Sequence, residues 1–184
     1  MKKSMTFEAV LFDLDGTLLN TLEDIADAAN TVLVRHGYPT HALDDYRYFV
    51  GDGAPVLVRR VIPEAARSDD VVERLYEEFR VEYGRNWNAK TRPYAGVPAM
   101  LDGLSRLSLK LAVLSNKPDD FTRRCVSELL PEGRFDVVSG VRNGTPPKPD
   151  PTGALRIAAE LEIAPERCLF AGDTSIDVKT AIAA

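Results

Sequence analysis

The sequence predicts an α/β protein: a doubly wound, Rossmann-like parallel sheet core with an inserted α-helical cap. Short apolar runs alternate with helical patterns, which is typical of parallel strands that are buried on both faces. A long block with almost no β-type run separates the first two apolar runs, which indicates an insertion. The expected strands are Glu8–Phe12, Leu109–Leu114, Phe135–Ser139 and Cys168–Ala171.

Helical patterns connect the later strands, and each is long enough for a parallel crossover. The chain ends at Ala184, about two turns into a further helix. A doubly wound sheet usually continues with another strand and helix, so we expect either a truncated chain or a core that is one unit short. The expected core helices are Val97–Leu107, Asp119–Leu130 and Thr152–Leu161.

The block from about Thr21 to Asn88 is expected to be helical throughout, because its apolar residues recur at helical spacing. We therefore divide the chain into an α/β catalytic core, residues 1–18 and 92–184, and a helical cap, residues 19–91. The expected cap helices are Leu22–His36, Leu43–Phe49, Ala54–Val61 and Asp69–Trp87.

The composition narrows the class of protein. The chain has 184 residues, of which 45% are hydrophobic and 28% charged, as in soluble globular proteins. The net charge is −5 without any long block of like charge, so we expect no nucleic-acid or membrane partner. Glu8 breaks the first apolar run, which argues against a signal peptide. Cys125 and Cys168 lack C-x-x-C spacing, which favours reduced thiols and a cytoplasmic protein. We expect a monomer or a homodimer.

Polar residues gather where the expected strands end. In an open α/β sheet, ligands bind beyond the carboxyl ends of the strands, so residues far apart in sequence converge there. The candidate residues are Asp13, Asp15 and Thr17 after the first strand, Ser115 and Asn116 after the second, Asp173 and Asp177 after the fourth, and Lys148 before a core helix.

The aspartates in this set predict a metal site. Asp13 and Asp15 point the same way in an extended chain, and Gly16 permits a sharp turn after them. Crowded carboxylates need a cation, and ligands that are all oxygen suit Mg²⁺. Asp173 and Asp177, four residues apart, can supply one ligand and one supporting carboxylate; alone, they would be read as helix capping.

Four motifs stand in order along the chain: D-L-D-G-T at residues 13–17, S-N at 115–116, K-P-D-P at 148–151 and G-D-T-S-I-D at 172–177. In these motifs the chain resembles the haloacid dehalogenase superfamily of phosphohydrolases. The set spans nearly the whole sequence. One departure is Leu19-Asn20-Thr21, where the family usually has an Asp-Ser pair.

The resemblance implies a role for each matching residue. Asp13 is the expected nucleophile that forms an aspartyl-phosphate, and Asp15 the general acid and then base. Ser115 would hydrogen-bond the transferring phosphoryl group, and Lys148 would offset its charge. Substrate contacts are also expected from Thr17 and Asn116. The expected Mg²⁺ ligands are Asp13, Asp15 through its carbonyl oxygen, and Asp173, with Asp177 beside them.

The expected cap holds a Gly-x-Gly turn, Gly51 and Gly53, followed by Arg59 and Arg60. This segment resembles the cap of phosphoglycolate phosphatases, which implies that Arg60 meets the carboxylate of a small phosphorylated metabolite such as 2-phosphoglycolate. The alternative is an ordinary loop with a solvated arginine.

Three other interpretations remain open. A sugar-phosphate mutase uses the same pair, Asp13 and Asp15, but returns the phosphoryl group to its substrate. A truncated, non-catalytic binding protein would keep the fold alone. A receiver-like domain also phosphorylates an aspartate, but it gives no reason for a helical cap.

Overall fold

The computed structural model describes residues 7–184, so the N-terminal end of the expected core, residues 1–6, lies outside the described residues. The chain divides into two compact units. Within the described residues, the α/β unit comprises residues 7–19 and Pro93–Ala184, and the helical unit comprises Asn20–Arg92. Each junction falls one residue after the boundary that the sequence suggested.

The α/β unit contains a parallel four-stranded sheet in the order β5-β4-β1-β6. The central strand β1 (Ala9–Phe12) pairs with β4 (Lys110–Pro118) and β6 (Cys168–Ala171), and β5 (Val137–Val141) pairs with β4. All four residues of β1 are buried, which explains its uninterrupted apolar sequence. The expected parallel sheet is confirmed.

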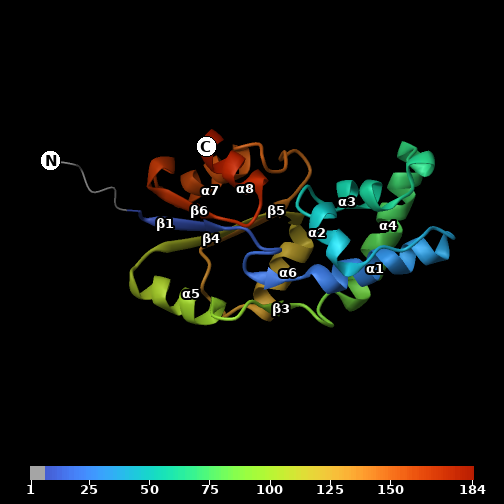
Figure 1. Cartoon of the computed structure of the whole chain (residues 1–184). Helices are drawn as coiled ribbons and strands as arrows, with labels where there is room; N and C mark the ends of the chain where they lie inside the picture. Colours follow the sequence, from blue (N-terminus) through green and yellow to red (C-terminus); the bar gives the residue numbers. More distant parts are fainter. Residues whose placement is uncertain (1–6) are drawn as a thin grey trace. The chain divides into compact units, whose positions relative to one another are not determined.

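Helices cover both faces of this sheet (Figure 1). Helices α5 (Val97–Arg106) and α6 (Asp119–Leu129) lie on one face, and α7 (Thr152–Glu160) and α8 (Ser175–Ala183) on the other. Apolar side chains of α7 pack against β1, β4 and β5 in one core cluster. The predicted doubly wound α/β fold is therefore confirmed.

Strand β4 is longer than the sequence predicted. We expected it to end at Leu114, but it continues to Pro118 through buried Ser115, Asn116 and Lys117. These polar residues form hydrogen bonds inside the protein, so polarity there did not mark the end of the strand. Two of the candidate site residues therefore lie on the strand itself.

The helical unit contains α1 (Leu22–Arg35), α2 (Tyr46–Phe49), α3 (Ala54–Val61) and α4 (Asp69–Asn86). The helix expected at Leu43–Phe49 begins instead as a 3₁₀ turn, Leu43–Asp45. Two short strands at the junctions, β2 (Leu19–Asn20) and β3 (Arg92–Pro93), were not predicted. In residues 7–184, every helix is too short or too polar to cross a bilayer.

A buried carboxylate joins the two ends of the helical unit. Asp24, in the first turn of α1, accepts hydrogen bonds from the amide of Lys90 at 3.0 Å and the amide of Thr91 at 2.8 Å. It also accepts one from the Thr91 hydroxyl at 2.7 Å, and both Asp24 and Thr91 are buried. These bonds fix the start of α1 to the segment before β3.

We predict that Asp24→Ala lowers the free energy of unfolding by about 2–4 kcal/mol, because buried amides lose their acceptor. Exposed Asp27, which forms an ion pair with Lys90, is the matched control, and Asp27→Ala should cost less than about 1 kcal/mol. Urea unfolding followed by the fluorescence of Trp87, the single tryptophan, measures both. Equal losses would contradict this account.

Candidate functional site

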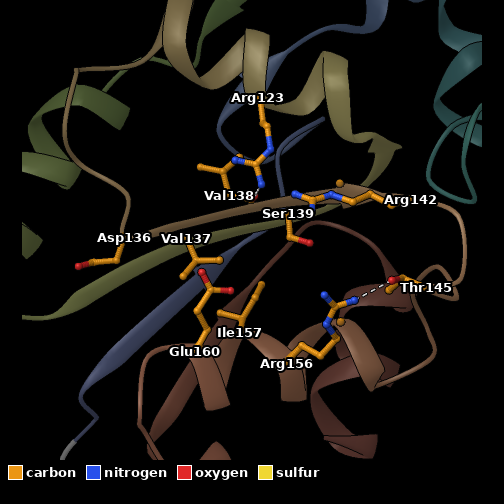
Figure 2. Close-up of a pocket in the computed structure, with 12 residues that line it drawn as sticks. Arg123, Asp136, Val137, Val138, Ser139, Arg142, Thr145, Arg156, Ile157 and Glu160 are labelled. Atoms are coloured by element: carbon orange, nitrogen blue, oxygen red, sulfur yellow. Dashed lines mark hydrogen bonds between the residues drawn. The ribbon is translucent and has the colours of Figure 1, made fainter.

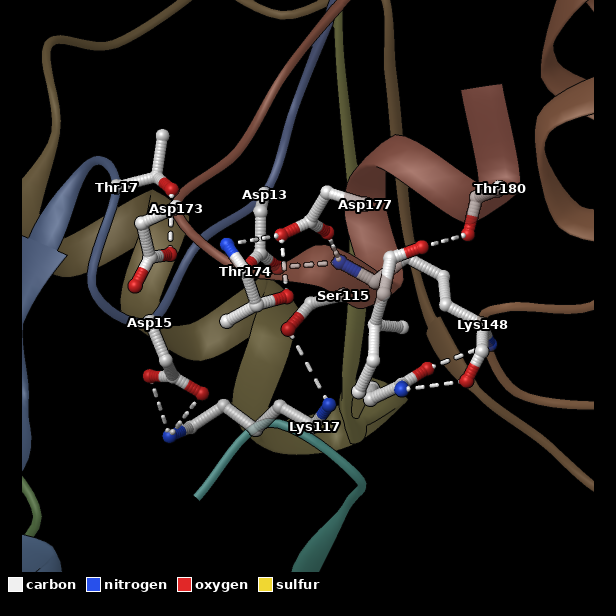
Figure 3. Close-up of polar contacts among 12 residues, drawn as sticks. Asp13, Asp15, Thr17, Ser115, Lys117, Lys148, Asp173, Thr174, Asp177 and Thr180 are labelled. Carbon is white, nitrogen blue, oxygen red and sulfur yellow. Dashed lines mark hydrogen bonds and ion pairs between the residues drawn. The ribbon is translucent and has the colours of Figure 1, made fainter. Parts of the chain in front are cut away.

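The carboxyl ends of β1, β4 and β6 bring the expected polar residues together (Figure 3). Asp13 follows β1 directly, and its amide donates a hydrogen bond to the carbonyl of Ala171 at the end of β6. Its side chain is buried, and burial raises the pKa of Asp13 to about 6 although Lys148 opposes this effect. A buried carboxyl group with a raised pKa therefore stands at the centre of the site.

Lys148 connects two of the aspartates. Its Nζ lies 2.7 Å from Oδ1 of Asp13 and 2.6 Å from Oδ1 of Asp177. The lysine is 5% exposed, and its ammonium lies 5.6 Å from the centre of the Phe170 ring. A buried ammonium needs such partners, so Lys148 is a fixed part of the site and not a solvated loop residue.

Asn116 holds the backbone of Lys148. Its Nδ2 donates to the carbonyl of Lys148 at 2.9 Å, and its Oδ1 accepts from the Lys148 amide at 2.7 Å. The sequence assigned Asn116 to the substrate; in the structure its amide fixes the lysine loop against β4. A contact between Asn116 and a substrate stays a prediction.

Asp177 is held at the start of α8. Its Oδ2 accepts hydrogen bonds from the amide of Thr174 at 3.0 Å and from the Thr174 hydroxyl at 2.7 Å. Burial favours the neutral carboxyl, but Lys148 and these bonds hold the pKa of Asp177 below its usual value. Asp177 therefore caps α8 and also supplies negative charge to the site.

Asp173 is the exposed member of the cluster, and Thr17 orients it by donating a hydrogen bond to its Oδ1 at 2.9 Å. Gly16 lies against Asp173 with a φ of +90°, and a Cβ there would come within 2.5 Å of Oδ2 of Asp173. The turn thus needs glycine both for its conformation and for the carboxylate beside it. The expected contact of Thr17 with substrate stays a prediction.

Three aspartates are placed to share one metal ion. Ligand oxygens of Asp13, Asp173 and Asp177 all lie within 4.8 Å of one another. The site holds four carboxylates, including that of Asp15, and two ammonium groups, those of Lys148 and Lys117. Four negative and two positive charges leave a formal charge of −2, which one divalent cation would balance, and oxygen ligands fit Mg²⁺. The residues therefore fit the expected metal.

Lys117 is the site residue that the sequence reasoning missed. Its Nζ lies 3.0 Å from Oδ1 and 3.2 Å from Oδ2 of Asp15. Ser115, two residues earlier, is also buried, and its Oγ accepts a hydrogen bond from the Lys117 amide at 3.2 Å. The period-two spacing of Ser115 and Lys117 places both side chains on one side of β4, which could have marked Lys117 as a site residue but not Asp15 as its partner.

The candidate substrate residues of the helical unit can be described within that unit. Gly51 and Gly53 have φ values of 109° and 93°, so the turn requires glycine. Arg60 donates to the carboxylate of Asp52 and to the carbonyl of Phe49 at 3.1 Å. Arg60 therefore braces the glycine turn, and its contact with a substrate stays a prediction.

A separate cavity of about 180 Å³ lies along β5 and α7 (Figure 2). Three arginines line it, but Arg123 and Arg142 both bind Asp119, and Arg156 donates to Oγ1 of Thr145. The cavity shares no lining residue with the acidic cluster. The acidic cluster, which combines a buried carboxyl, a buried ammonium and metal-ligand geometry, is therefore the candidate active site.

The chain is similar to several proteins of known name. The chain is 34% identical to a phosphoglycolate phosphatase of Aquifex aeolicus, over 92% of this chain and 78% of the relative. It is 34% identical to a phosphoglycolate phosphatase of Pseudomonas syringae pv. tomato, over 95% of this chain and 65% of the relative. An N-acetylmuramic acid 6-phosphate phosphatase of Pseudomonas aeruginosa is 33% identical over 97% and 78%.

A crystal structure from Lactobacillus delbrueckii, provisionally assigned as a phosphoglycolate phosphatase, has a TM-score of 0.91 and 31% identity. The match covers 97% of this chain and 83% of that one. The family model of haloacid dehalogenase-like hydrolases matches residues 10–184, which include the aspartates and Lys148 of the site. The expected resemblance is thus confirmed, and the chain belongs to the haloacid dehalogenase-like hydrolase family.

Proposed function

We propose that the chain is a Mg²⁺-dependent phosphatase that hydrolyses a small organic phosphate monoester through a phosphorylated aspartate. The buried Asp13 carboxyl, bonded to Lys148 and flanked by Asp173 and Asp177, carries this proposal. An anion accepts a phosphoryl group only where positive charge offsets the approach of two negative groups. Lys148 provides one such charge, and the geometry of the three aspartates supports a second from a metal.

In this proposal an oxygen of Asp13 attacks phosphorus, and the bond from phosphorus to the leaving oxygen breaks. The leaving alkoxide takes a proton from Asp15, which then removes a proton from the water that hydrolyses the aspartyl-phosphate. Ser115 hydrogen-bonds the phosphoryl oxygens, while Lys148 offsets their charge. The hydrolysis is thus split into two displacements at phosphorus: the oxygen of Asp13 attacks in the first, and in the second water attacks while the bond from phosphorus to Asp13 breaks, and each barrier is lower than that of the direct reaction.

Asp13, Asp173 and the carbonyl oxygen of Asp15 would hold Mg²⁺, with Asp177 as a supporting carboxylate. When bound, the ion supplies positive charge for the phosphoryl oxygens and for the crowded carboxylates. The distances among Asp13, Asp173 and Asp177 support this assignment.

The proposed substrate class is a phosphate monoester that also carries a carboxylate. The names of relatives at 34% and 33% identity give two phosphate esters of acids, phosphoglycolate and N-acetylmuramic acid 6-phosphate, so identity does not choose between them. Arg60, which already binds the carboxylate of Asp52, has the fork geometry that suits a substrate carboxylate. We take 2-phosphoglycolate as the first candidate.

The first test is activity. Asp13→Asn should lower phosphate release from small monoesters, in the presence of Mg²⁺, by at least about 100-fold, because the nucleophile is lost. Asp102→Asn, which alters an ion pair with Arg134 outside the site, is the matched control and should keep full activity. EDTA should silence the wild type, and Mg²⁺ should restore it. A retained rate above a few per cent in Asp13→Asn would rule out this nucleophile, and turnover without release of free phosphate would favour a mutase.

The second test uses the pKa of Asp13, which burial raises from 3.8 to about 6 in the metal-free protein. The folded state then binds this proton more tightly than the unfolded state, so the free energy of unfolding falls as pH rises through about 4 to 6. In EDTA at about pH 8, Asp13→Asn should therefore raise that free energy, by up to about 3 kcal/mol. At about pH 4 the gain should vanish.

Asp136→Asn is the control of opposite sign. Although burial opposes it, bonds from Lys110 and the Leu111 amide lower the pKa of Asp136, so this change should destabilise the protein at about pH 8. Urea unfolding at the two pH values measures both variants. A metal-free Asp13→Asn protein that is no more stable than the wild type at about pH 8 would refute the buried-charge account.

The third test concerns the arginines of α3. Arg60→Ala should raise KM for 2-phosphoglycolate by about 10-fold or more, while KM for p-nitrophenyl phosphate, which lacks a carboxylate, changes little. Arg59, which binds Asp69, is the adjacent matched control, and Arg59→Ala should change neither value. Equal effects of Arg60→Ala on both substrates would remove the carboxylate role.

A further inference from the structure

Two lysines bind different carboxyl groups of the site (Figure 3). Lys148 binds Asp13 and Asp177, whereas Lys117 binds both oxygens of Asp15. The side chain of Lys117 is 5% exposed, while that of Asp15 is 23% exposed. Asp15 is thus accessible to solvent or substrate, while the buried ammonium of Lys117 contacts its two oxygens.

Placing a second buried ammonium in the site is costly, because burial removes the hydration of a charged group. At the opposite end of β4, Lys110 forms an ion pair with Asp136 while 54% exposed, so the strand itself does not require a buried lysine. The desolvation cost of burying the Lys117 ammonium is offset by its interaction with Asp15, whose carboxyl group must point toward the substrate. This contrast points to a role in the reaction and not only in folding.

We propose that Lys117 is a positioning residue that orients the carboxyl group of Asp15 for its two proton transfers. This inference rests on the proposed function. The single ammonium of Lys117 contacts both oxygens of Asp15 and thereby restricts where the carboxyl group can lie, and proton transfer to a bound ester requires such a restricted position. Lys117 keeps its own protons: the proton passes from Asp15 to the leaving oxygen, and later from water to Asp15.

The location of Lys117 separates this role from that of Lys148. Lys148 contacts the nucleophile Asp13, so its loss should slow the attack on phosphorus. Lys117 contacts Asp15, so its loss should slow the steps that need proton transfer. An ester with a good leaving group requires little help from an acid in the first step, and it can therefore distinguish the two roles.

The experiment compares Lys117→Met with the matched control Lys110→Met, using p-nitrophenyl phosphate and Mg²⁺. Lys117→Met should release the first equivalent of p-nitrophenolate at a rate within about threefold of the wild type. Its steady-state rate should fall by at least about 10-fold, because hydrolysis of the aspartyl-phosphate still needs Asp15. Lys117→Arg, whose guanidinium also offers two donors to a carboxylate, should restore part of that rate.

Other results would overturn the inference. A parallel fall of the first turnover and the steady state in Lys117→Met would indicate a general structural loss. A higher KM with an unchanged kcat would make Lys117 a substrate-binding residue. A steady-state rate equal to that of Lys110→Met would leave it no role in the reaction.

A second readout does not depend on activity, so it separates failure of this inference from failure of the proposed function. The urea midpoints of Lys117→Met, Asp15→Asn and the double variant should be non-additive, because the two side chains share one interaction. Additive shifts would overturn the pairing even in an active enzyme. An inactive wild type would refute the phosphatase assignment, and with it the role of Lys117 in proton transfer, while non-additive midpoints would keep the pair itself.

Discussion

The bond from the buried ammonium of Lys148 to the carboxyl groups of Asp13 and Asp177 is the interaction on which the site depends. It joins three parts of the chain: the end of β1, the loop before α7 and the start of α8. Without it, two buried carboxylates would face one another unneutralised, which is among the costliest arrangements in a protein interior. The surrounding contacts, such as the two hydrogen bonds between the Asn116 side chain and the Lys148 backbone, keep this ammonium in place.

The fold could be predicted from the sequence because buried positions are apolar and recur with a spacing that differs between strands and helices. The apolar runs of β1 and β4 and the helical spacing of α1 and α4 each follow directly from which residues are buried. The aspartates and Lys148 were found because several acidic residues at the ends of neighbouring strands are tolerated only beside positive charge. These parts of the site can be predicted from the type of each residue and from its position relative to the strands.

Other features of the site could not be predicted from residue type and strand position. Ser115 and Asn116 were expected just beyond the strand, and Lys117 was not singled out, because polar residues within a strand are recognised only once their buried partners are known. The pairing of Lys117 with Asp15 joins residues 102 positions apart, and nothing local to either residue encodes it. For the same reason, the bond from Thr17 to Asp173 was hidden until the fold placed the two residues side by side.

The central claim is that Asp13 carries the phosphoryl group, and the most direct measurement is to trap it there. The protein is mixed with a monoester bearing radiolabelled phosphate and Mg²⁺, quenched in acid within the first turnover and digested. The account predicts label on the peptide that contains Asp13, stable in acid and released by hydroxylamine, as expected of an acyl phosphate. Free phosphate released with no labelled peptide, or label on another residue, would contradict it.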